Sequence, residues 1–251
     1  MKLFLLPHQD DEVPVFHAID TMVHNQQPLT IVYLTTGQAS TESCERRNRE
    51  SLQVLGKLGV KPYQTHFLGA PMGVADGSLQ RHLEVLRLAI IALVKDTPVT
   101  GIYMPAWEGG HPDHDAAHLI GLSLAQLWHC TSQSHQFPYY HGEGLKGMLF
   151  KILSPLAQNG PSTIQKISAR KRLQYLNLLL DYQSQLKTWM GLGPFFMLHY
   201  ALRGTQILQG ISHLRIHEKP HPGPMLYERR RFGTFECFRQ ETAEFTRQHV
   251  D

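Results

Sequence analysis

The chain has few cysteines, few charged residues and almost no net charge, and each shortage excludes a class of protein. Its 251 residues include three cysteines with no C-x-x-C spacing, which is typical of reduced thiols in a cytoplasmic protein rather than of a disulfide framework. Charged residues make up 18% and the formal net charge is +3. Such a small basic excess argues against a dedicated nucleic-acid-binding protein. A hydrophobic content of 42% is typical of a folded globular chain.

Long apolar runs are also missing. No stretch approaches the ~20 apolar residues of a transmembrane helix, and the polar PHQDDE follows the N-terminal MKLFLLP too closely for a secretory signal. The most apolar stretch, residues 190–202 (MGLGPFFMLHYAL), is broken by two Gly, a Pro and a His. We interpret it as a buried segment, a lid or a membrane-surface patch, with core packing favoured. Peripheral membrane contact therefore stays open.

Short apolar runs alternate with helical patterns through the first half of the chain. This alternation predicts an α/β fold with a mostly parallel sheet and helices on both faces. The second half is less regular, and the simplest interpretation is one domain over 1–251 with a variable C-terminal part from about 141. Strands are expected over 3–6, 29–33, 65–68, 101–104, 135–140 and 227–238, helices over 12–24, 41–58, 79–95, 114–128 and 171–189, and a loop over 155–168.

Two short polar segments follow two of the predicted strands. PHQDDE, residues 7–12, comes after the first, and HPDH, residues 111–114, comes after the fourth. In parallel sheets ligands bind at the carboxyl ends of the strands, so both segments are expected at one cleft. Although the chain has 16 histidines, only those in these segments are placed for chemistry.

The residue types in the two segments are those of a catalytic zinc site. Such sites take three nitrogen or oxygen ligands and keep a position open for water. His8 and Asp11 are three residues apart in a turn, and His111 and His114 are three apart at the start of a helix, where both share one face. Asp10 is then free to take the proton of the water, and the spare histidine can stabilise the oxyanion or protonate the leaving amine.

Each segment alone has a simpler interpretation, because acids after a strand often only cap a helix. Their joint occurrence favours a metal site. His118, one turn beyond His114, could support the site, but packing is the favoured interpretation. The chain contains no G-x-S-x-G, no P-loop, no G-x-G-x-x-G after a strand and no H-E-x-x-H.

In this order the motifs resemble those of the LmbE/PIG-L family of zinc-dependent N-deacetylases. The family's (A/P)-H-x-D-D-E is matched by PHQDDE and its H-x-D-H by HPDH. The family's R-x-x-E is matched by Arg47 and Glu50, and its L-G…D-G segment by 68–69 and 76–77, with several extra residues between. A Y-x-S-Q segment is matched at 182–185. The resemblance is specific over about 3–118 and thin afterwards.

The resemblance implies a Rossmann-like fold and assigns roles to single residues. It implies zinc ligands at His8, Asp11 and His114, and a general base at Asp10. By the same resemblance His111 assists the oxyanion or the leaving amine, and Asp113 orients a histidine. Arg47 and Asp76 are implied to contact the sugar. Zn²⁺ suits this ligand set, and Fe²⁺ also fits it.

The implied activity is hydrolysis of an N-acetyl (N-acyl) group on an amino sugar. An N-acetylglucosamine-containing glycoside, a sugar nucleotide or a lipid-linked glycan would each serve as the N-acylated substrate. Two alternatives remain: a zinc amidohydrolase acting on a non-sugar N-acyl amine, and a non-catalytic metal-stabilised glycan-binding subunit. A pocket ringed by Arg47 and Asp76 would favour the sugar, and an aromatic pocket the non-sugar amine.

Overall fold

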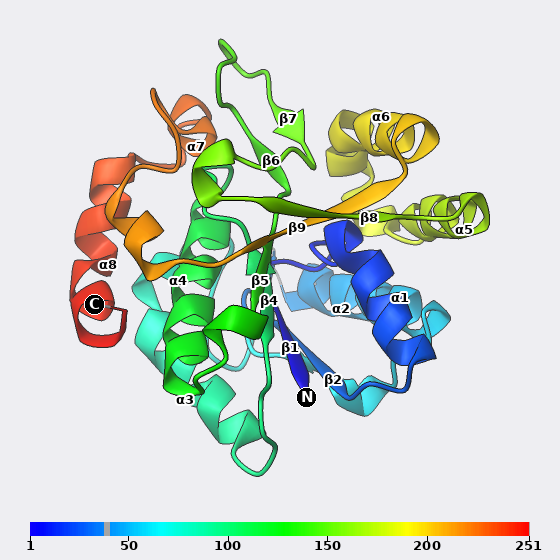
Figure 1. The fold of residues 1–251 in the computed structure, drawn as a ribbon, viewed down its shortest axis with the longest axis horizontal. Helices are drawn as coiled ribbons and strands as arrows, with labels where there is room; N and C mark the ends of the chain where they lie inside the picture. The colour runs from blue at the N-terminus through cyan, green and yellow to red at the C-terminus, as the bar shows by residue number, and fades with distance from the viewer. Residues whose placement is uncertain (38–40, 251) are drawn as a thin grey trace.

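A seven-stranded sheet organises the chain, with helices on both of its faces (Figure 1). The computed structural model describes residues 1–37 and 41–250. The first five strands of the order pair in parallel, and the last two pairings along the order are antiparallel. The order across the sheet is β3 (Thr65–Phe67), β2 (Leu29–Tyr33), β1 (Lys2–Leu6), β4 (Ile102–Pro105), β5 (His135–Phe137), β9 (Thr205–Gly210) and β8 (Ser162–Lys166). A separate ribbon pairs β6 (Tyr140–His141) with β7 (Lys151–Ile152).

The helices cover the sheet in two groups. In Figure 1 α1, α2 and α5 lie to one side of the sheet, and α3, α4 and α8 to the other. The α-helices are α1 (Phe16–His24), α2 (Thr41–Lys57), α3 (Leu83–Val94), α4 (Pro112–Leu127), α5 (Ala169–Leu179), α6 (Leu186–Leu202), α7 (Leu226–Arg229) and α8 (Phe235–His249). Short 3-10 turns lie at Val13–Val15, Pro62–Gln64, Leu79–Arg81, Thr131–Gln133, Ala157–Asn159, Gln183–Gln185 and His213–His217. Within the described ranges, no helix has the length and apolarity needed to cross a bilayer.

Two hydrophobic cores flank the sheet because successive strand residues point to opposite faces. Phe4 and Leu6 of β1 pack into the core under α1 and α2, while Leu3 and Leu5 pack into the core under α3 and α4. All four side chains are fully buried, and each contributes about 1.5–3 kcal/mol by leaving water. A strand buried on both faces has no polar alternation, as the run KLFLL shows.

The parallel α/β fold expected from the alternating pattern is confirmed, and so is its Rossmann-like order. β1 and β4 are neighbours, with Leu3 opposite Ile102 and Phe4 opposite Tyr103. The chain leaves β1 toward α1 on one face and leaves β4 toward α4 on the other (Figure 1). This is the topological switch point, where the crevice of such sheets forms.

Several expectations for the second half were wrong. The segment 155–168, expected as a loop, contains the edge strand β8, whose five residues are all exposed and show no apolar alternation. The expected strand 227–238 is instead α7 and the start of α8. Thr234 Oγ1 accepts a hydrogen bond from the Cys237 backbone N–H and caps α8. The single strand expected over 135–140 is divided into β5 and β6 at Pro138, which has no N–H to donate.

The single helix expected over 171–189 was also wrong. α5 ends at Leu179, a 3-10 turn covers Gln183–Gln185, and α6 begins at Leu186. The interruption is caused by tertiary contacts, because the Tyr182 hydroxyl donates to the buried Glu12 carboxylate and the Ser184 N–H donates to Glu50. Residues 190–202 belong to α6, and several of their large side chains are exposed. The favoured expectation of core packing is confirmed for Leu192, Phe196 and Tyr200 and was wrong for the exposed side chains of this segment.

Gly69→Ala should lower the free energy of unfolding by about 1–3 kcal/mol or more. A Cβ at Gly69 would overlap the backbone carbonyl of Thr35 and the backbone nitrogen of Thr36. The backbone cannot yield cheaply here, because Thr36 N–H donates to Val74 O and Val74 N–H donates to Gly69 O. Urea denaturation measures the change. Gly56→Ala is the matched control, since nothing lies within 4 Å of its Cβ position. Equal stabilities of the two variants would contradict this packing.

Candidate metal centre

The segments after β1 and β4 meet at the switch point of the sheet. The His8 ring lies 4.9 Å from that of His111 and 5.5 Å from that of His114, measured between centroids. Both contacts follow from the pairing of β1 with β4, which places the carboxyl ends of the two strands side by side. Three imidazoles from segments about a hundred residues apart thus share one crevice.

Asp11 lies between two of these imidazoles. Its Oδ2 is 3.1 Å from His8 Nδ1, and its Oδ1 is 3.3 Å from His114 Nε2. The His8 backbone N–H also donates to Asp11 Oδ2 at 2.7 Å, which holds the turn. Burial by itself would raise the pKa of Asp11, but the imidazoles of His114 and His8 outweigh it and hold the pKa below its ordinary value. The carboxyl group is therefore an anionic donor.

This triad has the dimensions of a metal site. Ligands at 2.0–2.2 Å from a tetrahedral ion lie about 3.4 Å apart, close to the separations from Asp11 to the two imidazole nitrogens. Ligand atoms of His8, Asp11 and His114 all lie within 4.8 Å of one another, and all three residues are buried. A second group of His8, Asp76, His111 and Asp113 meets the same distance criterion. We favour the triad, because both Asp113 oxygens already accept backbone N–H groups.

The Asp113 carboxylate is held by two backbone N–H groups and contacts one histidine of the crevice. Its Oδ1 accepts from the Leu79 N–H and its Oδ2 from the Gly77 N–H. The same Oδ2 lies 2.9 Å from His8 Nε2 but 3.9 Å from His111 Nδ1. Metal-binding histidines typically bond a carboxylate through their second nitrogen. The imidazole that the Asp113 carboxylate orients is therefore that of His8.

His111 faces the crevice with a defined nitrogen. Its Nδ1 accepts the Asp113 backbone N–H at 3.2 Å and caps the N-terminus of α4. In a neutral imidazole the proton must then sit on Nε2, which lies 3.6 Å from Asp76 Oδ1. Burial lowers the pKa of His111 to about 4. The ring therefore presents an N–H donor to the crevice.

Asp10 is held beside the triad in a conformation that most residues avoid. Its φ of 112° lies in the left-handed region, which costs a non-glycine residue about 1–3 kcal/mol. Its N–H donates to Glu12 Oε2 at 3.0 Å, and Arg47 Nη2 lies 3.4 Å from its Oδ1. Burial raises the pKa of Asp10 to about 8, although the Arg47 guanidinium opposes the change. The contacts with Glu12 and Arg47 thus hold the Asp10 backbone in this unfavourable conformation.

Glu12 and the 182–185 segment are structural partners that the sequence motifs did not explain. Glu12 is fully buried and accepts the Tyr182 hydroxyl at 2.7 Å. With its amide turned to accept, Gln185 takes a hydrogen bond from Arg47 Nε at 2.7 Å. The Y-x-S-Q segment is therefore fastened to both PHQDDE and R-x-x-E. The contacts of Tyr182 with Glu12 and of Gln185 with Arg47 could not be predicted from the spacing of these motifs along the chain.

The crevice opens into a pocket of about 250 Å³. Arg47 and Asp76, expected at the substrate, both line it together with Asp10 and the three histidines. Asp76 is 45% exposed, and its Oδ1 lies 3.2 Å from His8 Nε2. Arg47 is buried and donates to the backbone oxygens of Gln9 and Gly37.

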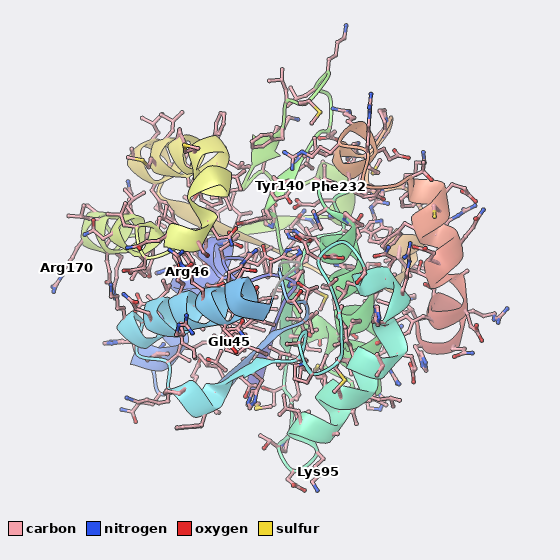
Figure 2. All side chains as sticks on the ribbon, turned by 180° about the vertical axis from the view of Figure 1, so that it is seen from behind. Glu45, Arg46, Lys95, Tyr140, Arg170 and Phe232 are labelled. Carbon is pink, nitrogen blue, oxygen red and sulfur yellow. The ribbon has the colours of Figure 1, made fainter. Side chains whose placement is uncertain are left out.

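The outer wall of the pocket comes from the second half of the chain and was missed by the sequence analysis. Figure 2 shows two of its residues, Tyr140 and Phe232, near one another. Phe232 packs against His111, with 5.6 Å between ring centroids. The segments that form this wall share no motif. The wall residues are Tyr139, Tyr140, Leu192, Arg230 and Phe232.

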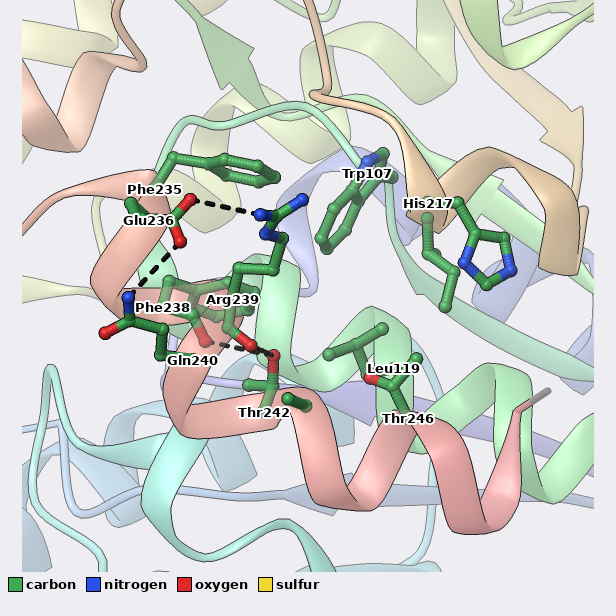
Figure 3. A pocket seen from close by; sticks show the side chains of 12 residues that line it. Trp107, Leu119, His217, Phe235, Glu236, Phe238, Arg239, Gln240, Thr242 and Thr246 are labelled. Carbon is green, nitrogen blue, oxygen red and sulfur yellow. Dashed lines mark hydrogen bonds and ion pairs between the residues drawn. The ribbon is translucent and has the colours of Figure 1, made fainter.

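A second cavity, of about 400 Å³, lies against α8 (Figure 3). Its charged side chains are occupied with each other, since Arg239 Nη2 lies 3.3 Å from Glu236 Oε2. Trp107, Phe235 and Phe238 form much of the lining. His118, expected to pack, is fully buried nearby with its Nδ1 2.9 Å from Pro105 O, and it does not line the histidine pocket. The cavity against α8 therefore offers no cluster of reactive side chains like that of the histidine pocket.

The fold is that of solved deacetylases. The pseudoaglycone deacetylase Dbv21 superimposes with a TM-score of 0.62 at 15% identity, covering 84% of this chain and 96% of that one. N,N'-diacetylchitobiose deacetylase from Pyrococcus horikoshii gives 0.56 at 18% identity, covering 84% and 82%. A zinc-inhibited form of the teicoplanin deacetylase Orf2 gives 0.61 at 12% identity, covering 84% and 97%. No curated protein matches the chain by sequence.

The first half of the chain matches a known family. The model of the family described as PIG-L: GlcNAc-PI de-N-acetylase matches residues 3–125. This stretch, which holds PHQDDE and HPDH, matches the PIG-L family. The resemblance inferred from the motifs is confirmed.

Proposed function

We propose that this protein is a metal-dependent hydrolase that removes an N-acetyl group, or a related N-acyl group, from an amino sugar. The observation that carries the proposal is the Asp10 carboxyl group, held in one pocket with the buried triad of His8, Asp11 and His114. The family description and the names of Dbv21 and the chitobiose deacetylase support an N-deacetylase. An N-acetylglucosamine unit in a glycoside, a sugar nucleotide or a lipid-linked glycan fits the pocket's polar floor.

His8, Asp11 and His114 would hold the metal, and Zn²⁺ or Fe²⁺ suits their donor atoms. When bound, such an ion lowers the pKa of a coordinated water to about 7 and polarises a carbonyl oxygen. The chain's own contribution is an anionic Asp11 between two imidazoles and a His8 ring fixed by Asp113.

Asp10 would act as the general base. Its carboxyl group lines the pocket beside the triad, and Arg47 and the Glu12 contact at its N–H restrict its position. In its ionised form it takes the proton of the attacking water and would pass it on to the leaving amine. His111 would assist the oxyanion through its Nε2–H, which faces the pocket because its Nδ1 already accepts the Asp113 N–H.

Arg47 and Asp76 would bind the sugar. Arg47, whose N–H groups already reach Gln9, Gly37, Asp10 and Gln185, would contribute its positive charge. The half-exposed Asp76 carboxylate would provide acceptors for ring hydroxyls. The long loop before Asp76 does not remove it from the pocket. We also propose a single domain over 1–251, since one sheet runs from β3 to β8. The free thiols of Cys44, Cys130 and Cys237 favour a cytoplasmic location.

One observation favours a second substrate class. Tyr139, Tyr140 and Phe232 line the pocket, and such an aromatic wall suits a non-sugar N-acyl amine. The polar residues Arg47 and Asp76 favour the sugar, which we retain as the first candidate.

Purified protein should release acetate from an N-acetylglucosamine conjugate and should lose this activity after treatment with a chelator. Readdition of about one equivalent of Zn²⁺ or Fe²⁺ should restore it, because three ligands hold one ion. Acetate is measured enzymatically over a panel of N-acetylated sugars, sugar nucleotides, glycolipids and aromatic N-acetyl amines. Release from only the aromatic amines would favour the second class. Chelator-resistant turnover would contradict the metal-dependent mechanism, and metal binding without turnover of any substrate would favour a glycan-binding subunit.

A further inference from the structure

The outward face of α6 carries no exposed polar side chain over residues 190–202. Exposed residues of a surface helix are normally charged or polar, but those between 190 and 202 are Met, Gly, Pro, Phe, Leu and Ala. At about 100° per residue they span an arc of roughly 160°. The large side chains on this arc, with their exposed fractions, are Met190 67%, Phe195 47%, Met197 58%, Leu198 56% and Leu202 74%.

The opposite face of α6 is anchored, so its orientation is fixed. Phe196 is fully buried, and its ring centroid lies 5.9 Å from that of Tyr139. Tyr200 packs on Tyr175 of α5 at 6.2 Å, and its hydroxyl donates to Val13 O at 3.4 Å. The packing of the buried face therefore fixes which side chains of α6 are exposed.

This face continues toward the histidine pocket through a row of rings. Phe195 contacts Phe150 with centroids 5.5 Å apart, and Phe150 contacts Tyr140 at 6.2 Å. Figure 1 shows the same neighbourhood, with β7 beside α6. The Arg230 guanidinium lies 5.4 Å from the centroids of both Tyr140 and Phe150. Met148 and Leu149, 56% and 64% exposed, extend the apolar surface next to Phe150.

Cationic residues outnumber acidic ones in the segment that carries this apolar surface. Residues 144–205 contain eight Lys or Arg and one Asp, although the whole chain has a net charge of only +3. Arg203 is exposed directly after α6, and with Lys151 it borders a groove of about 470 Å³ lined by Leu198 and Leu202. An apolar helix face with flanking cations is the pattern of proteins that lie in an anionic membrane interface.

We propose that the exposed face of α6, together with residues 148–150, docks on the surface of a bilayer containing anionic lipids. The apolar side chains enter the boundary between headgroups and acyl chains, and Arg203 and Lys151 bind the headgroups. The helix lies in the plane of the interface and does not cross it, in accord with its length and composition. Binding is measured without substrate, so it stands or falls independently of the deacetylase proposal.

The test is co-sedimentation of the full-length protein with vesicles of phosphatidylcholine, with and without about one third phosphatidylglycerol. Wild-type protein should sediment with the anionic vesicles and more weakly with neutral ones. The double variant Leu198→Glu/Leu202→Glu should bind anionic vesicles at least about tenfold more weakly. Arg203→Gln should weaken binding about fivefold, the effect of one interfacial cation.

The matched control is Val85→Glu/Leu88→Glu on α3, where both side chains are exposed, 44% and 52%, and lie outside the proposed face. This variant should bind as wild type does, and thermal melts should show that all variants are folded. Absence of binding by the wild type would overturn the proposal, as would equal binding by the two double variants. A wild-type dimer that Leu198→Glu/Leu202→Glu converts to a monomer, measured by light scattering, would show instead that the face joins two copies.

Discussion

An Asp10→Asn enzyme should bind its metal normally and hydrolyse its N-acetyl substrate about 10²–10⁴-fold more slowly. The amide has the shape of the carboxyl group and can still accept from Arg47, which lies 3.4 Å from Oδ1. It cannot take the proton of the attacking water at neutral pH. The measurement combines kcat under saturating substrate with metal content per chain.

Asp20→Asn is the matched control for this experiment. Asp20 is also buried, but it binds Lys171 and Tyr175 away from the pocket. The control variant should keep its kcat, whatever it loses in stability. Normal turnover by Asp10→Asn would remove Asp10 from the mechanism. Loss of metal from the same variant would instead place Asp10 among the ligands.

His8→Ala and His114→Ala should each lose the bound metal, from about one ion per chain to nearly none. Either change leaves only two of the three protein donors, and the buried Asp11 carboxylate loses one of the imidazoles that lie 3.1 Å and 3.3 Å from its oxygens. Turnover should fall with the metal. The upward shift in thermal melting that added Zn²⁺ produces in the wild type should also disappear, because ligand binding stabilises the folded state.

His118→Ala tests whether any buried histidine of α4 would give the same result. His118 lies one turn beyond His114 and is equally buried, but its Nδ1 contacts Pro105 O and it does not line the pocket. This variant should keep its metal. Full metal content in both His8→Ala and His114→Ala would disprove the triad, whereas loss of metal from His8→Ala alone would favour the group of His8, Asp76, His111 and Asp113.

The first half of the fold was predictable because its elements carry strong periodic signals. The run LTIVY forms β2 with the expected bounds, and α2 lies within one residue of its expected end. β8 could not be predicted, because an exposed edge strand such as STIQK buries no alternating face. The start of α8 was hidden for another reason: the cap at Thr234 outweighs the apolar alternation that suggested a strand.

The candidate site also has a part that could be predicted from the sequence and a part that could not. PHQDDE and HPDH could be recognised because short turns after strands hold several reactive residues at fixed spacing. The pocket wall could not, since Tyr139, Leu192 and Arg230 come from three separate elements that share no spacing. Glu12 belonged to a motif, but its partner Tyr182 lies 170 residues away. Contacts of this kind leave no periodic trace in the sequence.

The anchoring of Glu12 by Tyr182 limits how the chain can be divided. A fragment ending at 125 would hold every proposed ligand and the whole stretch matched by the family model. It would lack the hydroxyl that donates to the buried Glu12 carboxylate, and a buried acceptor left without its donor costs about 1–3 kcal/mol. Glu12 in turn accepts the N–H of Asp10. Chimaeras built between relatives should therefore inherit residues 182–185 together with PHQDDE, because a recombination breakpoint between them would separate the strained Asp10 turn from its support.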